Sequence, residues 1–266
     1  MCIIVYKPSE AKLPDKQTLK KCWKNNPDGA GYMFPNKDTV VIKKGFMNFN
    51  EFYKQLVYDK NQYGEFTPFV MHFRVSTQAG VNKECTHPFP LSEEMENLKK
   101  LRVKCQCGIA HNGVIDLTSD RWNKTITYSD TMKFITDYLT LIITTKDWYK
   151  DKGKLKLIEK LAESKLAVMM GNGHVELIGD FIEENGIFYS NQYYKLNRWS
   201  TTTTTTTTKQ SKMKQTKQSF FFFDGKTVEI IDGIFTVFGH NYFSFGVVVN
   251  LYINKTQGIR PKIYNR

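Results

Sequence analysis

A tract of eight consecutive threonines at residues 201–208 limits what this chain can fold into. The tract continues as "KQSKMKQTKQS" without apolar periodicity, so residues 201–219 are predicted to form a low-complexity, disordered linker. Residues 1–200 before it are long enough for a folded domain. Residues 220–266 after it are rich in Phe and basic, but too short for an ordinary domain. A β-rich tail that docks elsewhere is one interpretation of this last segment, whose structure stays open.

The positive charge of the chain is concentrated in its C-terminal part. The net charge is +12, and the residues from Thr201 onward contribute half of it, with nine Lys and Arg against three Asp and Glu. The longer body is therefore not markedly basic. It also contains no motif for a recognition helix in a nucleic-acid groove and no motif for aromatic stacking on bases, so nucleic acid is not expected as a partner.

The five cysteines and the absence of a secretory leader indicate a reducing compartment, and a cytoplasmic location is expected. No apolar run approaches the roughly 20 residues that cross a bilayer, so no membrane association is expected.

Apolar patterning predicts strands, then helices, then strands again. This order, with several hairpins, is typical of an α+β fold with mainly antiparallel sheets. Strands are predicted within residues 2–6, 29–34, 39–44, 67–76, 107–116, 165–179 and 186–191. Within 107–116 we expect two strands joined by a tight turn at Asn112-Gly113. Helices are predicted within 9–26, 49–60, 131–144 and 152–164, with Ser129 and Asp130 as the cap of the third.

Cys2 follows the initiator directly and raises a chemical question. One interpretation is a small buried residue placed there by chance. Alternatively, removal of Met1 would make it the N-terminal residue, and a small second residue such as Cys permits that removal. An α-amino group titrates near neutral pH, so a terminal cysteine carries its own base and can act as a nucleophile.

Other short motifs follow Cys2 in a definite order. They read "NPDGAGYMF", "HFRVSTQAG", "THPF", "HNGVI" and "YSDT". Each motif alone has an ordinary structural explanation, such as a core histidine, a hairpin turn or a helix cap. In this order the chain resembles the class II glutamine amidotransferases, the group of N-terminal-nucleophile (Ntn) hydrolases with an N-terminal cysteine. The resemblance covers about residues 2–190, including the late "GIFYSN".

The resemblance implies a fold and a catalytic set. The fold would be a four-layer αββα sandwich of two mainly antiparallel sheets. Cys2 matches the nucleophile, and Asn112 and Gly113 match the oxyanion hole. An N–H of Gly113 and the side-chain amide of Asn112 can both donate to a tetrahedral oxyanion.

The resemblance also implies a site for the amino-acid head of L-glutamine. Arg74 matches the arginine that binds the α-carboxylate, and Asp130 matches the acid that binds the α-ammonium. Thr77 matches a threonine that contacts the same head group. A zwitterion needs one fixed cation and one fixed anion, which these residue types supply. Residues 28–31 match the family's "DGxG" strand beside the nucleophile through Asp28, Gly29 and Gly31.

The expected activity is hydrolysis of the glutamine side-chain amide to glutamate and ammonia, without metal or cofactor. The cysteines and histidines around residues 85–111 have spacings unlike those of structural zinc sites. Nothing in the chain resembles a synthase, so a separate ammonia-accepting synthase or a stand-alone hydrolase is expected. Two alternatives stay open at this point. One is an Ntn-type amidase acting on another amide, and the other is a catalytically idle binding module with a basic tail.

Overall fold

The computed structural model describes residues 2–76, 80–116 and 128–195, and the backbone of three strands near the C-terminus. Contacts within the chain divide it into two units, Met1–Thr201 and Thr202–Arg266. Of the predicted linker, only Ser219 is among the described residues. The three strands of the second unit form an antiparallel sheet in the order β12 (Ser219–Phe223), β13 (Lys226–Ile231) and β14 (Ile234–Phe238).

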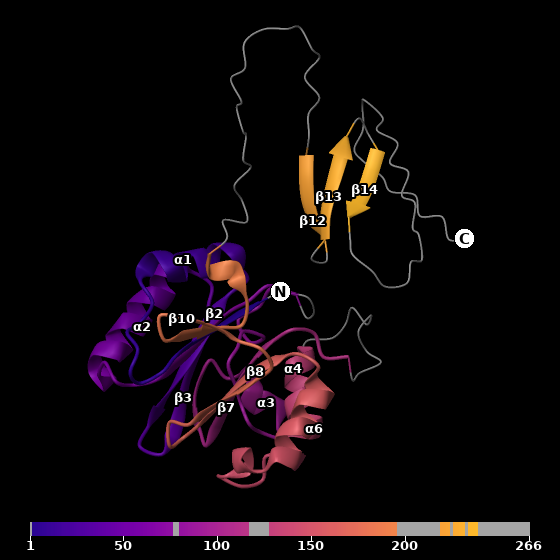
Figure 1. Ribbon diagram of the computed structural model, residues 1–266. Helices are drawn as coiled ribbons and strands as arrows, with labels where there is room; N and C mark the ends of the chain where they lie inside the picture. Colours follow the sequence, from indigo (N-terminus) through magenta and orange to yellow (C-terminus); the bar gives the residue numbers. More distant parts are fainter. Residues whose placement is uncertain are drawn as a thin grey trace, which may run out of the picture. The chain divides into compact units, whose positions relative to one another are not determined.

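The first unit contains two antiparallel sheets and several helices (Figure 1), so the prediction of an α+β fold with antiparallel sheets is confirmed. The larger sheet has the order β10 (Ile182–Glu184), β11 (Ile187–Tyr189), β1 (Ile3–Lys7), β4 (Phe69–Phe73), β2 (Ala30–Asn36), β3 (Thr39–Phe46) and β6 (Arg102–Cys105). The smaller sheet has the order β5 (Phe89–Pro90), β7 (Cys107–Asn112), β8 (Lys165–Met170) and β9 (Val175–Ile178).

The helices connect and cover these strands. They are α1 (Lys16–Asn25), α2 (Phe49–Tyr63), α3 (Met95–Lys99), α4 (Asp130–Phe134), α5 (Thr140–Ile142) and α6 (Lys152–Ala162), with the π-helical turn η1 (Ile135–Leu139) and the 3-10 turns η2 (Trp148–Lys150) and η3 (Gln192–Tyr194). Among the residues that the structure describes, none of these helices has the length and apolar character needed to cross a bilayer.

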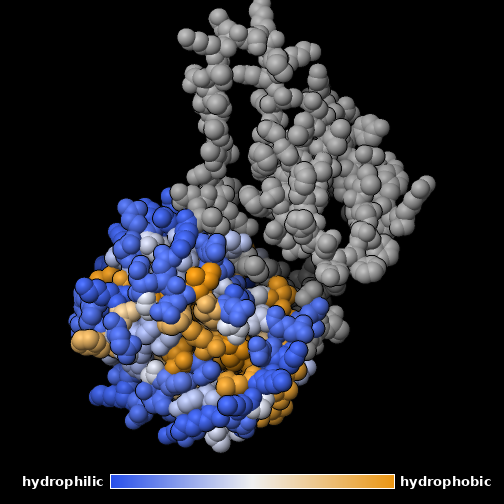
Figure 2. Space-filling model, viewed as in Figure 1, coloured by the Kyte–Doolittle hydropathy of each residue, from blue (hydrophilic) through white to orange (hydrophobic). Residues whose placement is uncertain are grey.

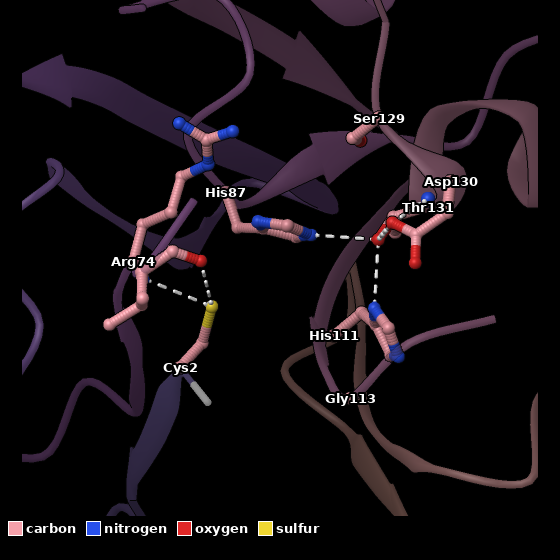
Figure 3. A pocket seen from close by; sticks show the side chains of 9 residues that line it. Cys2, Arg74, His87, His111, Gly113, Ser129, Asp130 and Thr131 are labelled. Atoms are coloured by element: carbon pink, nitrogen blue, oxygen red, sulfur yellow. Dashed lines mark hydrogen bonds between the residues drawn. The ribbon is translucent and has the colours of Figure 1, made fainter. Parts of the chain in front are cut away.

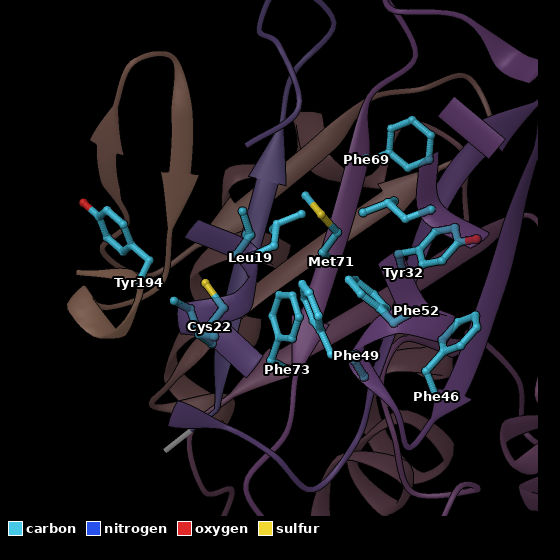
Figure 4. Packing of buried hydrophobic residues seen from close by; sticks show 14 of the residues in the cluster. Leu19, Cys22, Tyr32, Phe46, Phe49, Phe52, Phe69, Met71, Phe73 and Tyr194 are labelled. Atoms are coloured by element: carbon cyan, nitrogen blue, oxygen red, sulfur yellow. The ribbon is translucent and has the colours of Figure 1, made fainter. Parts of the chain in front are cut away.

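Three hydrophobic clusters fill the spaces between the layers of helices and sheets. A strand such as β1 or β8 contributes to two of these spaces, because alternate residues of a strand face opposite sides of the sheet. In β1, Ile3 and Val5 join a cluster with α1 and α2, whereas Ile4 joins a cluster between the two sheets. In β8, Leu166 faces the helices α4 and α6, whereas Ala167 faces the larger sheet. The order of layers, with helices α1 and α2, the larger sheet, the smaller sheet, and helices α4 and α6, is compatible with a layered sandwich. Figure 4 shows residues of the cluster that contains Ile3 and Val5, in which Phe52, Phe69 and Phe73 pack with residues of α1 such as Leu19.

Polar residues cover most of the visible surface of this unit. Figure 2 shows hydrophobic residues gathered near the centre of one face, in the region of β8 and β10, with hydrophilic residues around them.

Strand register brings distant parts of the sequence together. Ile3 pairs with Phe73 and Ile4 with His72 across the β1–β4 ladder. Continuing that register places Cys2 opposite Arg74. This ladder explains why a residue at the start of the chain and one about seventy positions later can share a site.

The expected second strand after the Asn112-Gly113 turn is wrong. Residues 113–116 are not in a strand, and β7 pairs with β5 and β8 instead. The backbone N–H of Ile115 donates to the carboxylate of Asp130 at 2.9 Å, so this segment leaves the sheet and turns toward α4. The predicted hairpin at residues 165–179 is confirmed as β8 and β9.

Candidate active site

Cys2, Arg74, Gly113 and Asp130 line one small cavity (Figure 3). The cavity volume is about 20 Å³, enough for about one water molecule. Its full lining is Cys2, Arg74, Val75, His87, His111, Gly113, Ser129, Asp130 and Thr131. Asn112 precedes Gly113 but does not line the cavity, and Thr77 lies outside the described residues.

Cys2 lies just before β1 and is held through both its side chain and its main chain. Its thiol donates to the carbonyl oxygen of Val75 at 3.4 Å, and the N–H of Val75 donates to the sulfur at 3.3 Å. The side-chain amide of Asn191 donates to the carbonyl oxygen of Cys2 at 2.7 Å. Burial raises the pKa of the Cys2 thiol, although the Val75 N–H, the N-terminal ammonium and Arg74 oppose this change. The thiol therefore needs a base to become a nucleophile.

Arg74 is a buried cation, only 3% exposed, at the end of β4. Its Nη1 donates to the carbonyl oxygen of Gly80 at 2.9 Å, and its Nη2 donates to Ser76 Oγ at 3.1 Å. These contacts hold the guanidinium beside the cavity, where it can meet an anionic group.

The "DGxG" segment reaches the site through the residues that follow β4. The N–H of Arg74 donates to the carbonyl oxygen of Gly29 at 2.8 Å, and Asp28 Oδ2 accepts from the N–H of Ser76 at 2.8 Å. In the larger sheet β4 lies between β1 and β2, so this segment is separated from β1 by one strand. The segment supports Arg74 and its loop instead.

Asp130 begins α4, and Ser129 caps that helix as predicted. The Asp130 carboxylate accepts from the N–H of Ile115 at 2.9 Å and from the N–H of Thr131 at 2.7 Å. Two backbone donors fix the carboxylate at the cavity, on the other side from Arg74 (Figure 3). The arrangement offers one cation and one anion to a ligand with both charges.

The position of Gly113 leaves no room for a side chain. A Cβ atom added at this position would lie 2.4 Å from Cβ of Ser164, so only glycine allows the two segments to approach. The neighbouring Asn112 is 5% exposed, and its Nδ2 donates to Ser190 Oγ at 2.9 Å. The backbone around Gly113 therefore lies at the cavity while the Asn112 amide contacts the end of β11.

Two histidines of the cavity lining share one threonine hydroxyl. His87 Nε2 lies 3.1 Å and His111 Nδ1 lies 2.8 Å from Thr131 Oγ1. His111 Nε2 lies 2.8 Å from Ser164 Oγ, whose own proton goes to the carbonyl oxygen of Ala162 at 2.7 Å. Thr131 Oγ1 also lies 3.3 Å from Asp130 Oδ1, so its single proton goes either to His111 Nδ1 or to that carboxylate. If it goes to His111, donation runs from His87 to Thr131, from Thr131 to His111 and from His111 to Ser164, and His87 Nδ1 has no partner among the described residues.

Burial keeps these histidines neutral, together with His72, whose ring packs on that of His87 at 4.2 Å between centroids. Burial lowers the pKa of His72 to about 3 and that of His111 to about 4, and it also holds the pKa of His87 well below its usual value. Sequence reasoning assigned His87 no part in the site. His87 belongs to the "THPF" motif. Phe89 pairs with Ile109 in the β5–β7 ladder, and continuing this antiparallel register by two residues places His87 opposite His111.

In the parts of the chain that the structure covers, no group of three His, Cys, Asp or Glu side chains is arranged to hold a metal ion. The chemistry that the described site can offer comes from a thiol, a guanidinium, a carboxylate and backbone N–H groups.

The sequence matches no protein-family model and no curated protein.

Proposed function

We propose that this chain hydrolyses the side-chain amide of L-glutamine, with Cys2 as an N-terminal nucleophile in an αββα sandwich of the Ntn-hydrolase type. The order of helices, two sheets and helices supports the proposed fold. The products are glutamate and ammonia, and the ammonia passes to solution or to a separate synthase.

One observation carries the proposal. Cys2, Arg74, Gly113 and Asp130 come from separate segments of the chain and line the same cavity. Arg74 and Asp130 flank the thiol with opposite charges, which suits the zwitterionic head of an amino acid. A purely structural explanation of each residue would not require all four at one place.

Removal of Met1 starts the proposed mechanism, because it frees the α-amino group of Cys2 as the base. That amine takes the thiol proton, and the sulfur attacks the amide carbon to form a tetrahedral oxyanion. The N–H of Gly113 stabilises this charge, and the amide of Asn112, which donates to Ser190 Oγ outside the cavity lining, would have to turn to join it. The C–N bond then breaks, the amine returns the proton to the departing ammonia, and a glutamyl thioester remains. Water hydrolyses the thioester and regenerates the thiol.

Glutamine is far larger than a cavity of about 20 Å³, so binding requires the lining side chains to separate. The bond from Arg74 to Gly80 is one that the substrate α-carboxylate would replace.

The test combines N-terminal mass spectrometry with measurement of glutamate release from glutamine, asparagine and other amides. We expect loss of Met1, preferential turnover of glutamine, and no turnover by Cys2→Ala. Cys105→Ala is the matched control, because Cys105 is a partly exposed thiol that does not line the cavity.

Preferential turnover of a different amide would favour another Ntn-type amidase. A chain that has lost Met1, is folded by circular dichroism and hydrolyses none of the amides would favour an idle binding module. Either result contradicts the proposed glutaminase.

A further inference from the structure

Asn191 connects the proposed nucleophile with the segment that follows β11. It belongs to the "GIFYSN" motif and is half-buried. Its Nδ2 donates to the carbonyl oxygen of Cys2 at 2.7 Å, and its Oδ1 accepts from the N–H of Tyr193 at 3.0 Å. One partner is a main-chain acceptor and the other is a main-chain donor. The orientation of the Asn191 amide is therefore determined by its contacts.

The contact to Cys2 continues the pairing of β1 with the chain beyond the end of β11 at Tyr189. The N–H of Ser190 donates to the carbonyl oxygen of Ile4 at 3.0 Å, and its Oγ accepts from the N–H of Ile4 at 2.8 Å. Asn191 then reaches Cys2 with its side chain. The main chain of the proposed nucleophile is therefore held by an amide side chain.

The turn that carries Asn191 is itself anchored to two elements. Asn191 is the N-terminal cap of η3 through its bond from Tyr193. The side-chain amide of Asn25, in α1, donates to the carbonyl oxygen of Tyr193. The ring of Tyr194 stacks on that of Tyr189, in β11, at 3.7 Å between centroids. The Asn191 side chain therefore starts from a fixed backbone.

Two anchors determine the orientation of residue 2. After removal of Met1 this residue has one peptide bond instead of two, so fewer contacts restrain it. Asn191 fixes the plane of the peptide bond between Cys2 and Ile3 through the carbonyl oxygen. The main chain of Val75 fixes the sulfur. The α-amino group is bonded to the same Cα atom, so these two anchors also determine where it points.

We infer that Asn191 is a positioning residue that holds the main chain of Cys2, and with it the α-amino group, in one orientation relative to the thiol. This inference rests on the proposed glutamine hydrolysis, in which that amine is the base. Asn191 does not line the cavity and acts through Cys2. A base must stay within hydrogen-bonding reach of the proton that it takes, so release of the carbonyl would slow the chemical step and leave the head-group contacts in place.

The kinetic test uses the full chain with Asn191→Ser and Asn191→Ala. Serine keeps an acceptor for the cap of η3 but is too short to reach the Cys2 carbonyl, whereas alanine loses both contacts. We expect both variants to lower kcat about 10-fold or more with KM within about 2-fold, because the base acts in the transition state. The urea midpoint of unfolding should be lower for Asn191→Ala than for Asn191→Ser, since only alanine loses the cap.

Tyr194→Phe is the matched control for a lost hydrogen bond in the same turn. The Tyr194 hydroxyl donates to Glu184 Oε2 at 2.7 Å, away from Cys2. We expect this variant to keep kcat. A loss of kcat in Asn191→Ala with an unchanged kcat in Asn191→Ser would assign Asn191 to capping alone and overturn the inference. An unchanged kcat in both variants would overturn it as well.

Alkylation of Cys2 by iodoacetamide gives a measurement that does not depend on activity. Burial raises the pKa of the thiol, whereas the N-terminal ammonium and Arg74 lower it and Asp130 raises it. The Asn191 variants retain Arg74 and Asp130, so a difference between variants reports the position of the amine. In Asn191→Ser we expect the midpoint of the pH–rate profile to move to higher pH by about half a unit or more, because the ammonium is less well placed to stabilise the thiolate.

The outcomes of this measurement separate the inference from the proposed function. N-terminal mass spectrometry identifies the alkylated residue and the state of the terminus. An unchanged midpoint in Asn191→Ser would refute the inference whatever the glutaminase activity. A raised midpoint in a protein that hydrolyses no glutamine would refute the glutaminase alone. Retention of Met1 would refute both, because the α-amino group of Cys2 would then not be free.

Discussion

Cys2 and Val75 exchange two hydrogen bonds, one from the thiol to the Val75 carbonyl oxygen at 3.4 Å and one from the Val75 N–H to the sulfur at 3.3 Å. Both contacts on the Val75 side come from the main chain. The position of the sulfur therefore depends on the backbone that leaves β4, and the side chain of residue 75 takes no part in these bonds.

We therefore expect Val75→Ala to retain glutamine turnover within about 3-fold, which corresponds to less than about 1 kcal/mol in the activation free energy. Steady-state glutamate release is the measurement, with Cys2→Ala as the inactive reference. A loss of turnover approaching that of Cys2→Ala would show that the Val75 side chain contributes to the site.

Arg74→Ala should weaken substrate binding, because its guanidinium is the buried cation at the cavity. A lost buried contact to a carboxylate corresponds to about 2–4 kcal/mol in kcat/KM, and we expect it to appear mainly in KM. Arg102→Ala is the control, since Arg102 also donates to carbonyl oxygens but does so from β6, away from the cavity. An unchanged KM in Arg74→Ala would place the head-group site elsewhere.

The buried neutral histidines predict a loss of stability in acid. Burial lowers the pKa of His72 to about 3 and that of His111 to about 4, whereas an unfolded histidine titrates near 6.5. Below about pH 6.5 the unfolded state takes up protons that the folded state does not. Each such histidine therefore lowers the free energy of unfolding by up to about 1.4 kcal/mol per pH unit, until the pH reaches its folded pKa.

Urea unfolding at pH 7.5, 6.0 and 5.0 measures this effect. His72→Gln keeps a donor for the carbonyl oxygen of His111 but does not titrate, so its stability should fall less steeply between pH 6.0 and 5.0. His174→Gln replaces a half-buried histidine and is the control. Equal pH dependence in the wild type and His72→Gln would contradict the assignment of a neutral buried His72.

Gly113→Ala should destabilise the fold and impair the site together. The added methyl group would meet Cβ of Ser164 at 2.4 Å, and such overpacking typically costs about 1–3 kcal/mol. Ser164→Gly removes the obstructing atom. We expect Gly113→Ala to be less destabilising in the Ser164→Gly background than in the wild type, as measured by a double-mutant cycle in urea. Additive effects would mean that another contact excludes the side chain.

Truncation after Thr201 should leave a folded and active unit. All residues of the three hydrophobic clusters and of the cavity lining lie between Cys2 and Tyr194. We expect the melting temperature to stay within about 3 °C, a change of about 1 kcal/mol for a unit of this size. Reduced turnover by a folded truncated chain would show that the C-terminal unit contributes to the site.

Local sequence patterns predicted many of the strands, turns and helix ends of this fold. Runs of consecutive apolar residues predicted strands such as β1 and β8, the Gly-Asn-Gly segment predicted the turn between β8 and β9, and Ser129 was recognised as a helix cap. These features are readable because strand patterning, tight turns and caps depend on residues within a few positions of one another. The order of motifs also indicated Cys2, Arg74, Gly113 and Asp130 as residues of one site.

Tertiary structure alone decided how those segments meet. The "HNGVI" motif suggested a hairpin, but the bond from Ile115 to Asp130 directs the chain out of the sheet. The roles of His87 and Ser190 depend on partners far away in the sequence, Thr131 for the first and Ile4 and Asn112 for the second. Such contacts follow from strand register and from the packing of one sheet on the other. A local pattern cannot specify them, because the same apolar alternation is compatible with several pairings until the whole core is packed.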